Sequence, residues 1–227
     1  MENIKEDIKN DEFAAFQFDG SAEGDRNRVE AGTLYLVATP IGNLADMTYR
    51  AVKVLSEVSF VAAEDTRNSG RLLSRFGISK PMVSYHEHNK AARGPEIVER
   101  LAAGESCALV TDAGTPGISD PGEDLVRLCA ENGVEVRAIP GCCAAVNALA
   151  VSGLPTGRFT FEGFLTVNKK SRREHLDSLK DETRTMIFHE APHKLRTTLN
   201  DLTEAFGPDR RIALCRELPK LHEEIRR

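Results

Sequence analysis

The sequence lacks several features that would assign it to a special class of protein. It has no apolar run that approaches the length of a membrane helix, so we expect no membrane association. Its first residues are acidic and broken by charge, which is unlike a secretory signal. Internal repeats and low-complexity tracts are also absent. With 227 residues, 41% of them hydrophobic and 29% charged, the chain predicts one large or two small soluble domains.

Cysteine is scarce and its spacing is uninformative. No Cys-x-x-Cys pair occurs, and five cysteines cannot all pair within one chain: Cys107, Cys129, Cys142, Cys143 and Cys215. Buried free thiols in a reducing compartment explain them better than a metal site or a disulfide framework. We therefore expect a cytoplasmic protein without a metal ion.

The net charge of -5 lies in one segment. Residues 1–31 contain nine Asp or Glu and four Lys or Arg, whereas residues 32–227 hold 26 of each sign. Because residues 1–31 also lack a sustained apolar period, we expect a mobile acidic extension there. Because residues 32–227 carry no net charge, the overall negative charge of the chain does not exclude an anionic partner.

The rest of the chain alternates short apolar runs with helical patterns. In the stretch from Ser106 to Gly122, an apolar run ends at Asp112, a loop rich in Gly and Pro follows, and a helical pattern begins near Pro121. Such alternation predicts an α/β fold with a parallel sheet. We expect one α/β domain at 32–152 and a second at 158–227, and we expect the second to be incomplete because the chain stops within an element.

Several motifs in fixed order carry a resemblance to one family. They are Thr39–Leu44, Ala63–Arg67, Thr111–Gly122, Pro140–Ala145 and Cys215–Leu218. With them the chain resembles the bacterial 16S ribosomal RNA cytidine 2′-O-methyltransferase family called RsmI, within the tetrapyrrole-methylase fold.

The resemblance implies two α/β domains with S-adenosylmethionine in the cleft between them. It implies a homodimer that methylates the ribose 2′-oxygen of a cytidine in the small ribosomal subunit. The tetrapyrrole enzymes of the fold usually carry a Gly-x-Gly-x-Gly-Asp first loop, and Pro40–Asn43 departs from it, which favours RNA. A methyltransferase of a small macrocycle and a non-enzymatic RNA- or nucleotide-binding protein remain the alternatives.

The loop after the central apolar run is the first candidate cofactor site. An acidic side chain such as Asp112 can accept hydrogen bonds from a ribose, and glycines let the backbone approach a ligand. A plain turn is the alternative. The cofactor residues that we expect, several of them on the resemblance alone, are Pro40, Asp112, Ala113, Gly114, Thr115, Ile118, Ser119, Ala144, Ala145 and Phe188.

The polar cluster Glu64, Asp65 and Arg67 is the candidate catalytic group. Methyl transfer to a hydroxyl needs alignment and a group that accepts the proton, and Asp65 or Glu64 fits that role. Arg67 is suited to hold a phosphate through paired hydrogen bonds. The alternative is a helix N-cap followed by a surface arginine.

Two basic clusters predict contacts with RNA phosphates. One comprises Lys169, Lys170, Arg172 and Arg173, and the other is a helical stripe of Arg67, Arg71 and Arg75. Ordinary solvated surface charge is the alternative. His86 and His88 lack a third ligand at a telling spacing, so a metal site there is disfavoured.

Overall fold

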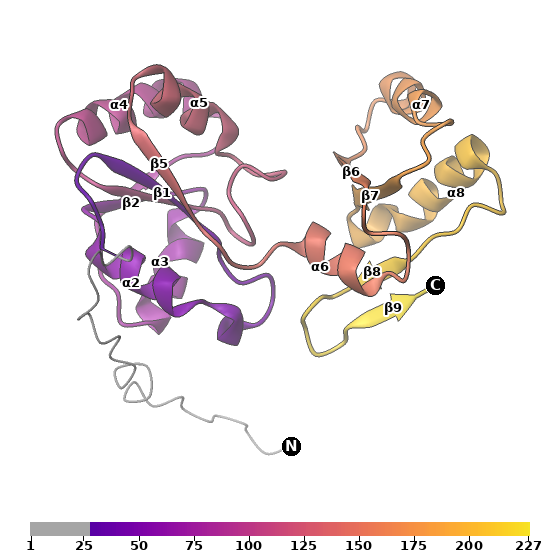
Figure 1. Cartoon of the computed structure of the whole chain (residues 1–227), viewed down its shortest axis with the longest axis horizontal. Coiled ribbons are helices and arrows are strands. Elements are labelled where there is room, and N and C mark those ends of the chain that lie inside the picture. Colours follow the sequence, from indigo (N-terminus) through magenta and orange to yellow (C-terminus); the bar gives the residue numbers. More distant parts are fainter. Residues whose placement is uncertain (1–27) are drawn as a thin grey trace, which may run out of the picture. The chain divides into compact units, whose positions relative to one another are not determined.

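The structure, a computed structural model, describes residues 28–227 (Figure 1). Most of the expected acidic extension, residues 1–27, lies outside the described residues. Glu30, at its end, forms paired hydrogen bonds of 2.8 and 2.7 Å with Arg137. The chain divides into two compact units: the first runs to Thr39 and continues through Ala45–Gly141, and the second comprises Pro40–Leu44 and Cys142–Arg227.

The first unit is built on a five-stranded parallel sheet with the strand order β3-β2-β4-β1-β5. The predicted α/β class with a parallel sheet is therefore confirmed. Its strands are β1 (Thr33–Val37), β2 (Phe60–Ala63), β3 (Met82–Ser84), β4 (Cys107–Val110) and β5 (Glu135–Ile139). Every residue of β2 and β4 is buried, as expected for strands that are covered on both faces and read as unbroken apolar runs.

Helices cover both faces of this sheet (Figure 1). They are α2 (Tyr49–Glu57), α3 (Thr66–Arg75), α4 (Lys90–Ala102) and α5 (Glu123–Glu131), with the 3-10 turn η1 (Leu44–Asp46). Val54 and Leu73, from α2 and α3, pack in one apolar cluster, and Ile97 and Leu125, from α4 and α5, pack in another. The side chains of successive strand residues point alternately into these two clusters, so one apolar core lies on each face of the sheet.

The second unit contains two small sheets. Parallel strands β6 (Phe159–Phe164) and β7 (Thr185–His189) form one, and antiparallel strands β8 (Leu214–Arg216) and β9 (Glu224–Arg226) form the other. The helical elements are α6 (Ala144–Val151), α7 (Lys169–Ser178), η2 (Pro192–Lys194) and α8 (Leu195–Phe206). Ala145 and Leu149 of α6 pack against Ile187 of β7.

Two details of the second unit differ from the sequence expectation. Helix α6, expected in the first domain at 32–152, groups with the second unit because its buried side chains contact β7. The segment Glu224–Arg226, for which the sequence predicted no strand, forms β9, and Arg227 donates to the carbonyl oxygens of Val151 and Ser152 at 2.7 and 3.1 Å. Short strands of this kind carry little periodicity, so pattern alone does not reveal them.

Gly122, which precedes α5, offers a test of the loop that follows β4. Its φ is +153°, and a Cβ there would lie 2.8 Å from the Gly117 nitrogen. We predict that Gly122→Ala lowers the free energy of unfolding by about 1–3 kcal/mol, because a side chain must be forced into that contact in a disfavoured backbone conformation. Urea titration measures the change.

Gly157→Ala is the matched control, since a Cβ at Gly157 meets nothing within 4 Å. Its stability should equal that of the wild type within about 0.5 kcal/mol. Equal stabilities for both variants would show that the loop is not closely packed.

Candidate functional site

The three glycine- and proline-bearing loops meet at the carboxyl end of β1. Thr39, which is fully buried, donates from its backbone nitrogen to the Gly114 carbonyl at 2.9 Å and accepts from the Gly114 nitrogen at 3.0 Å. Its hydroxyl donates to the Thr111 carbonyl at 3.1 Å. Gly141 lies so close to Ala38 that a Cβ on it would be 2.9 Å from the alanine Cβ. The loops after β1, β4 and β5 therefore share one edge.

This meeting point follows from the strand order. β4 and β5 flank β1 on its two sides, so the loops that leave their carboxyl ends must border the loop that leaves β1. The connection that leaves β1 passes β4 to reach β2. The connection that leaves β4 runs in the opposite direction and passes β1 to reach β5. In open α/β sheets, ligands bind outside the carboxyl ends of the strands at such a switch of direction.

The loop after β4 presents backbone where a ligand would approach. Gly114 and Gly117 have φ values of +89° and +81°, and Ser119 adopts +65°, which is uncommon for a residue with a side chain. Ile118 and Ser119 are exposed, as are Asp112 and Ala113, while Gly114 is buried against Thr39. Four of the six predicted cofactor residues of this loop are thus exposed in the first unit.

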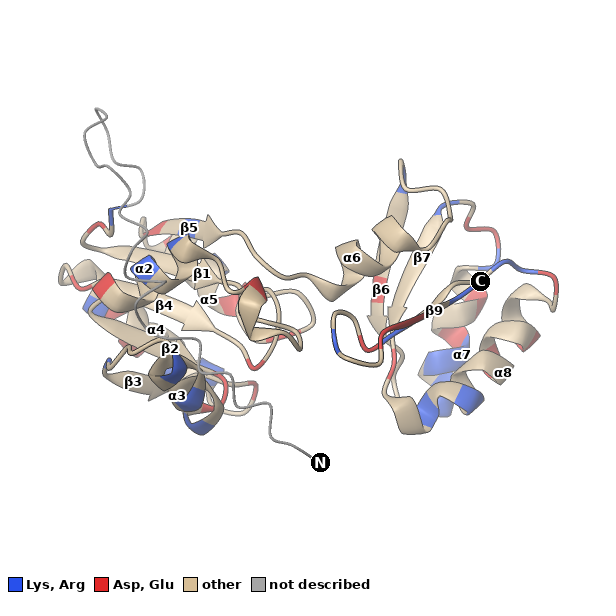
Figure 2. Cartoon of the chain, turned by 90° about the horizontal axis from the view of Figure 1, so that it is seen from below, with Lys and Arg blue, Asp and Glu red and all other residues tan. Residues whose placement is uncertain are grey.

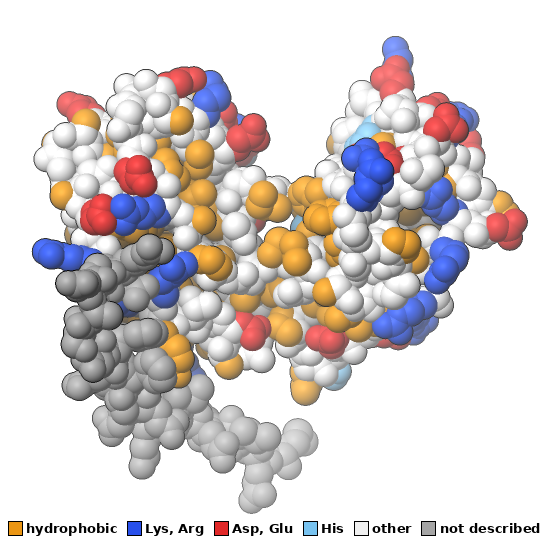
Figure 3. Space-filling model, in the orientation of Figure 1, with side chains coloured by type: hydrophobic (Ala, Val, Ile, Leu, Met, Phe, Trp, Pro, Cys, Tyr) orange, Lys and Arg blue, Asp and Glu red, His pale blue; other side chains and the backbone are white. Residues whose placement is uncertain are grey.

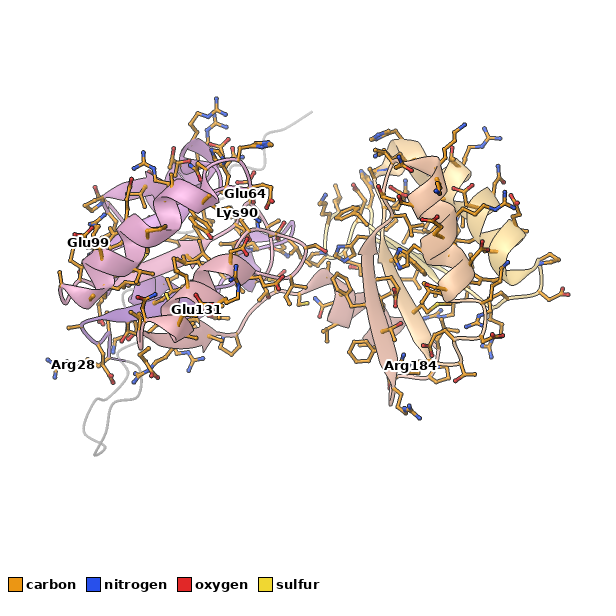
Figure 4. The ribbon with its side chains drawn as sticks, turned by 90° about the horizontal axis from the view of Figure 1, so that it is seen from above. Arg28, Glu64, Lys90, Glu99, Glu131 and Arg184 are labelled. Atoms are coloured by element: carbon orange, nitrogen blue, oxygen red, sulfur yellow. The ribbon has the colours of Figure 1, made fainter. Side chains whose placement is uncertain are left out.

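Three carboxylates gather at the same edge of the sheet. The Asp112 nitrogen donates to Glu64 Oε2 at 3.3 Å, and Asn68 Nδ2 donates to Asp112 Oδ2 at 3.0 Å; Figure 4 labels Glu64. The third is Asp120, whose pKa is raised to about 6 by burial and by the charges of Glu64 and Asp112. Because ionising all three carboxylates is unfavourable, the cluster suits a cationic ligand.

Asp65 is built as a helix cap. Its Oδ1 accepts from the Arg67 nitrogen at 2.8 Å, and its Oδ2 accepts from the Arg67 guanidinium at 2.9 Å. These bonds lower the pKa of Asp65 to about 2. A carboxylate with so low a pKa is a weak general base at neutral pH. The geometry therefore matches the capping alternative, and the expected role of Asp65 as a base stays an untested prediction.

The histidine loop after β3 carries an ion-pair network. Lys90 contacts Asp124 at 2.6 Å and Glu87 at 2.8 Å, and these carboxylates raise the pKa of Lys90; the lysine is labelled in Figure 4. His86 and His88 stack edge to face with ring centroids 6.0 Å apart. Within residues 28–227, no group of three or more His, Cys, Asp or Glu could hold a metal ion.

The remaining expected cofactor residues belong to the second unit. Pro40 follows Thr39 directly, Ala144 and Ala145 begin α6, and Phe188 lies on β7. Ala145 is buried against β7, so its small side chain already serves packing within this unit. Nothing in these contacts tests a cofactor role for the four residues, which stays a prediction.

Basic residues occur on α3 and α7 (Figure 2). Lys169, Lys170 and Arg71 are exposed, and Arg173 is 73% exposed beside Glu204. Arg172 differs, because its side chain is 13% exposed and donates to Asp201 Oδ2 at 2.6 Å and to Thr198 Oγ1 at 2.7 Å. Arg172 therefore ties α7 to α8, whereas its neighbours face solvent.

We predict that Arg172→Ala lowers the free energy of unfolding by roughly 2 kcal/mol, because it removes the cationic partner of the partly buried Asp201 and one of the two hydrogen bonds of the Thr198 hydroxyl. Arg173→Ala is the matched control and should cost less than about 1 kcal/mol, as exposed ion pairs do. Chemical denaturation at fixed ionic strength measures both. Equal losses would contradict a structural role that is specific to Arg172.

The raised pKa of Asp120 predicts a pH-dependent stability. Folding favours the protonated carboxyl, so the stabilisation is present below the ordinary aspartate pKa and is lost as the pH rises through about 6. Asp120→Asn mimics the protonated form. Its melting temperature should exceed that of the wild type at pH 7.5, and the difference should shrink at pH 4.

Exposed Asp181 supplies the control for this experiment, since Asp181→Asn should leave the pH dependence unchanged. A melting-temperature difference for Asp120→Asn that is independent of pH would contradict the assignment.

Sequence reasoning missed two side chains of this edge. Asn68, in the first turn of α3, lies one residue beyond Arg67 and donates to Asp112 in the loop after β4. Asp120 follows Ser119, and only the folded loop brings its carboxyl near Glu64. The available signal was the second Asp in an unusually Gly- and Pro-rich loop, which reads equally well as a turn residue.

Comparison with known proteins assigns a family to this architecture. The model of the tetrapyrrole (corrin/porphyrin) methylases matches residues 33–227. The ribosomal RNA small subunit methyltransferase I of Synechocystis sp. is 54% identical over 194 residues, which span 86% of this chain and 70% of that relative. The protein of the same name from Pseudomonas aeruginosa is 52% identical over 198 residues, with 87% and 70% covered.

Solved structures agree on the fold. A crystal structure of uroporphyrin-III-C-methyltransferase from Thermus thermophilus aligns with a TM-score of 0.59 and 21% identity, over 86% of this chain and 84% of that one. At this identity the likeness concerns the fold alone. No helix in the described part of the chain is long and apolar enough to cross a membrane.

Proposed function

Because this chain belongs to the tetrapyrrole methylases, and within them to the family of the ribosomal RNA small subunit methyltransferases I, we propose that it methylates the ribose 2′-oxygen of a cytidine in 16S ribosomal RNA. The observation that carries the proposal is the identity of 54% with such an enzyme over 86% of the chain. The meeting of three loops at the carboxyl end of β1 supports it independently.

S-adenosylmethionine is the proposed methyl donor, and when bound it supplies a methyl group activated by a positively charged sulfur. The residues at the sheet edge fit such a group. Asp112, Asp120 and Glu64 offer negative charge, and Gly114 and Gly117 allow close approach to the backbone. Asn68 holds one oxygen of Asp112 and leaves the other for a ribose hydroxyl. Pro40, Ala144, Ala145 and Phe188 remain proposed cofactor contacts on the family resemblance.

The chain must also remove a proton from the 2′-hydroxyl of the acceptor. Alignment supplies much of the acceleration, and a carboxylate within hydrogen-bond reach accepts the proton as the methyl–oxygen bond forms. A group with a pKa near 6 is better suited to this step than one near 2. We therefore propose Asp120 as the proton acceptor and keep Asp65 and Arg67 as the cap of α3. Glu64, which accepts from the Asp112 nitrogen at the same edge, stays a candidate on its position alone.

The exposed basic side chains are the proposed RNA contacts. Arg71 on α3 and Lys169, Lys170 and Arg173 on α7 can pair with phosphates and give affinity without reading sequence. Binding should therefore weaken as salt rises. A homodimer acting in the cytoplasm on the small ribosomal subunit fits the resemblance and completes the proposal.

Transfer of radioactive methyl groups tests the proposed activity. The purified protein should label small ribosomal subunits whose 16S ribosomal RNA lacks the modification. Digestion with a nuclease that does not need the 2′-hydroxyl, followed by a phosphatase, should release the label as 2′-O-methylcytidine. Label in a small macrocycle instead would favour the first alternative. No heat on titration with S-adenosylhomocysteine would favour the non-enzymatic alternative.

The division between cofactor and RNA residues gives a prediction. Asp112→Ala should weaken S-adenosylhomocysteine binding by about tenfold, since it removes a charge-assisted hydrogen bond. Lys169→Ala should leave that affinity unchanged and weaken RNA binding, with a smaller salt slope. Calorimetry and filter binding measure the two affinities, and equal loss of both in either variant would refute the division.

A further inference from the structure

An aromatic cluster at the carboxyl ends of β6 and β7 has no part in the proposed chemistry. The rings of Phe161 and Phe164 meet the ring of His189 edge to face, with centroids 5.2 and 5.3 Å away. Phe164 is nevertheless 58% exposed, and Val167 beyond it is 77% exposed. A large aromatic side chain that is both ordered by a neighbour and open to solvent is suited to hold a ligand.

A local irregularity of β6 builds this cluster. Residues 161 and 164 would point to opposite faces of a regular strand. The register shifts between Phe161 and Gly163, so Phe161 faces Ile187 and Phe164 faces His189, on the same side of the sheet. Gly163 takes a φ of +61°. The extra residue, Glu162, is anchored by His175 of α7 at 2.9 Å. Bulges of this kind re-aim side chains and are common beside functional sites.

His189 carries an unsatisfied polar atom within this cluster. Its Nε2 is buried and has no hydrogen-bond partner among the described residues. Burial lowers the pKa of His189, which favours the neutral ring. A buried nitrogen without a partner costs free energy, and a ligand that supplies one recovers it. This nitrogen belongs to a ring whose centroid lies 5.3 Å from that of the exposed Phe164.

Positive charge lies close to the cluster in the chain. Lys169 and Lys170 begin α7 five residues after Phe164, so the chain keeps Lys169 within about 18 Å of it. Both lysines are exposed, and the basic residues of α7 are blue in Figure 2. Apolar side chains also gather on the surface around α6, which packs on the same two strands (Figure 3).

We propose that Phe164 and His189 form a stacking site for one unpaired base of the RNA substrate, while Lys169 and Lys170 contact the flanking phosphates. The inference rests on the proposed function and deepens it. Single-stranded nucleic acid is bound by this combination of aromatic rings and cationic side chains. In a duplex the bases are already stacked, so the ring should contribute only when the base is free.

The test measures binding of a fluorescent single-stranded oligocytidylate and of an RNA duplex to the full chain. Phe164→Ala should weaken binding to the single strand by tenfold or more and leave duplex binding unchanged. Phe164→Tyr should retain wild-type affinity. Phe159→Ala is the matched control, because Phe159 lies on the same strand with 43% exposure and should matter to neither ligand.

Two further readouts separate the possible failures. His189→Phe keeps an aromatic ring and removes the nitrogen, so it should weaken binding of the single strand less than Phe164→Ala does. S-adenosylhomocysteine affinity should be unchanged in all variants, and its loss in Phe164→Ala would overturn the inference by placing the ring in the cofactor site. Unchanged single-strand binding by Phe164→Ala would overturn it too. Absence of methyl transfer by the wild type to ribosomal subunits would instead defeat the proposed function.

Discussion

The hydrogen bonds of Thr39 are the constraint on which the site depends. This buried residue joins the end of β1 to the loop after β4 through two backbone bonds and one hydroxyl bond. The loop is therefore fixed at the sheet edge although it contains three glycines and two prolines between Asp112 and Gly122. Because the loop is already ordered, a ligand that binds its backbone causes only a small further loss of conformational entropy in the loop.

Chemistry at this edge comes from an uneven distribution of negative charge. Asp65 and Arg67 satisfy each other and cap a helix, which lowers the pKa of that carboxyl to about 2. Asp120 is half-buried beside two other acids, which raises its pKa to about 6. Asp65 and Asp120 thus differ in their affinity for a proton, and this difference is the reason why Asp120 is the proposed proton acceptor.

The sequence predicted the architecture of the first unit well, because unbroken apolar runs such as Phe60–Ala63 and Cys107–Val110 are buried on both faces. It did not predict that Arg172 is tied to Asp201 or that a bulge brings Phe164 to His189. Both depend on contacts between segments that only packing aligns, and a basic run or an aromatic strand looks the same with or without them.

The central claim is that the loops at the carboxyl end of β1 hold the methyl donor. Amide chemical shifts in the presence of S-adenosylhomocysteine test it most directly, because each backbone amide reports its own surroundings. The account predicts the largest changes at Thr39 and from Asp112 to Ser119, the segments joined by the Thr39–Gly114 bonds. Saturable changes that leave these amides unmoved would contradict it.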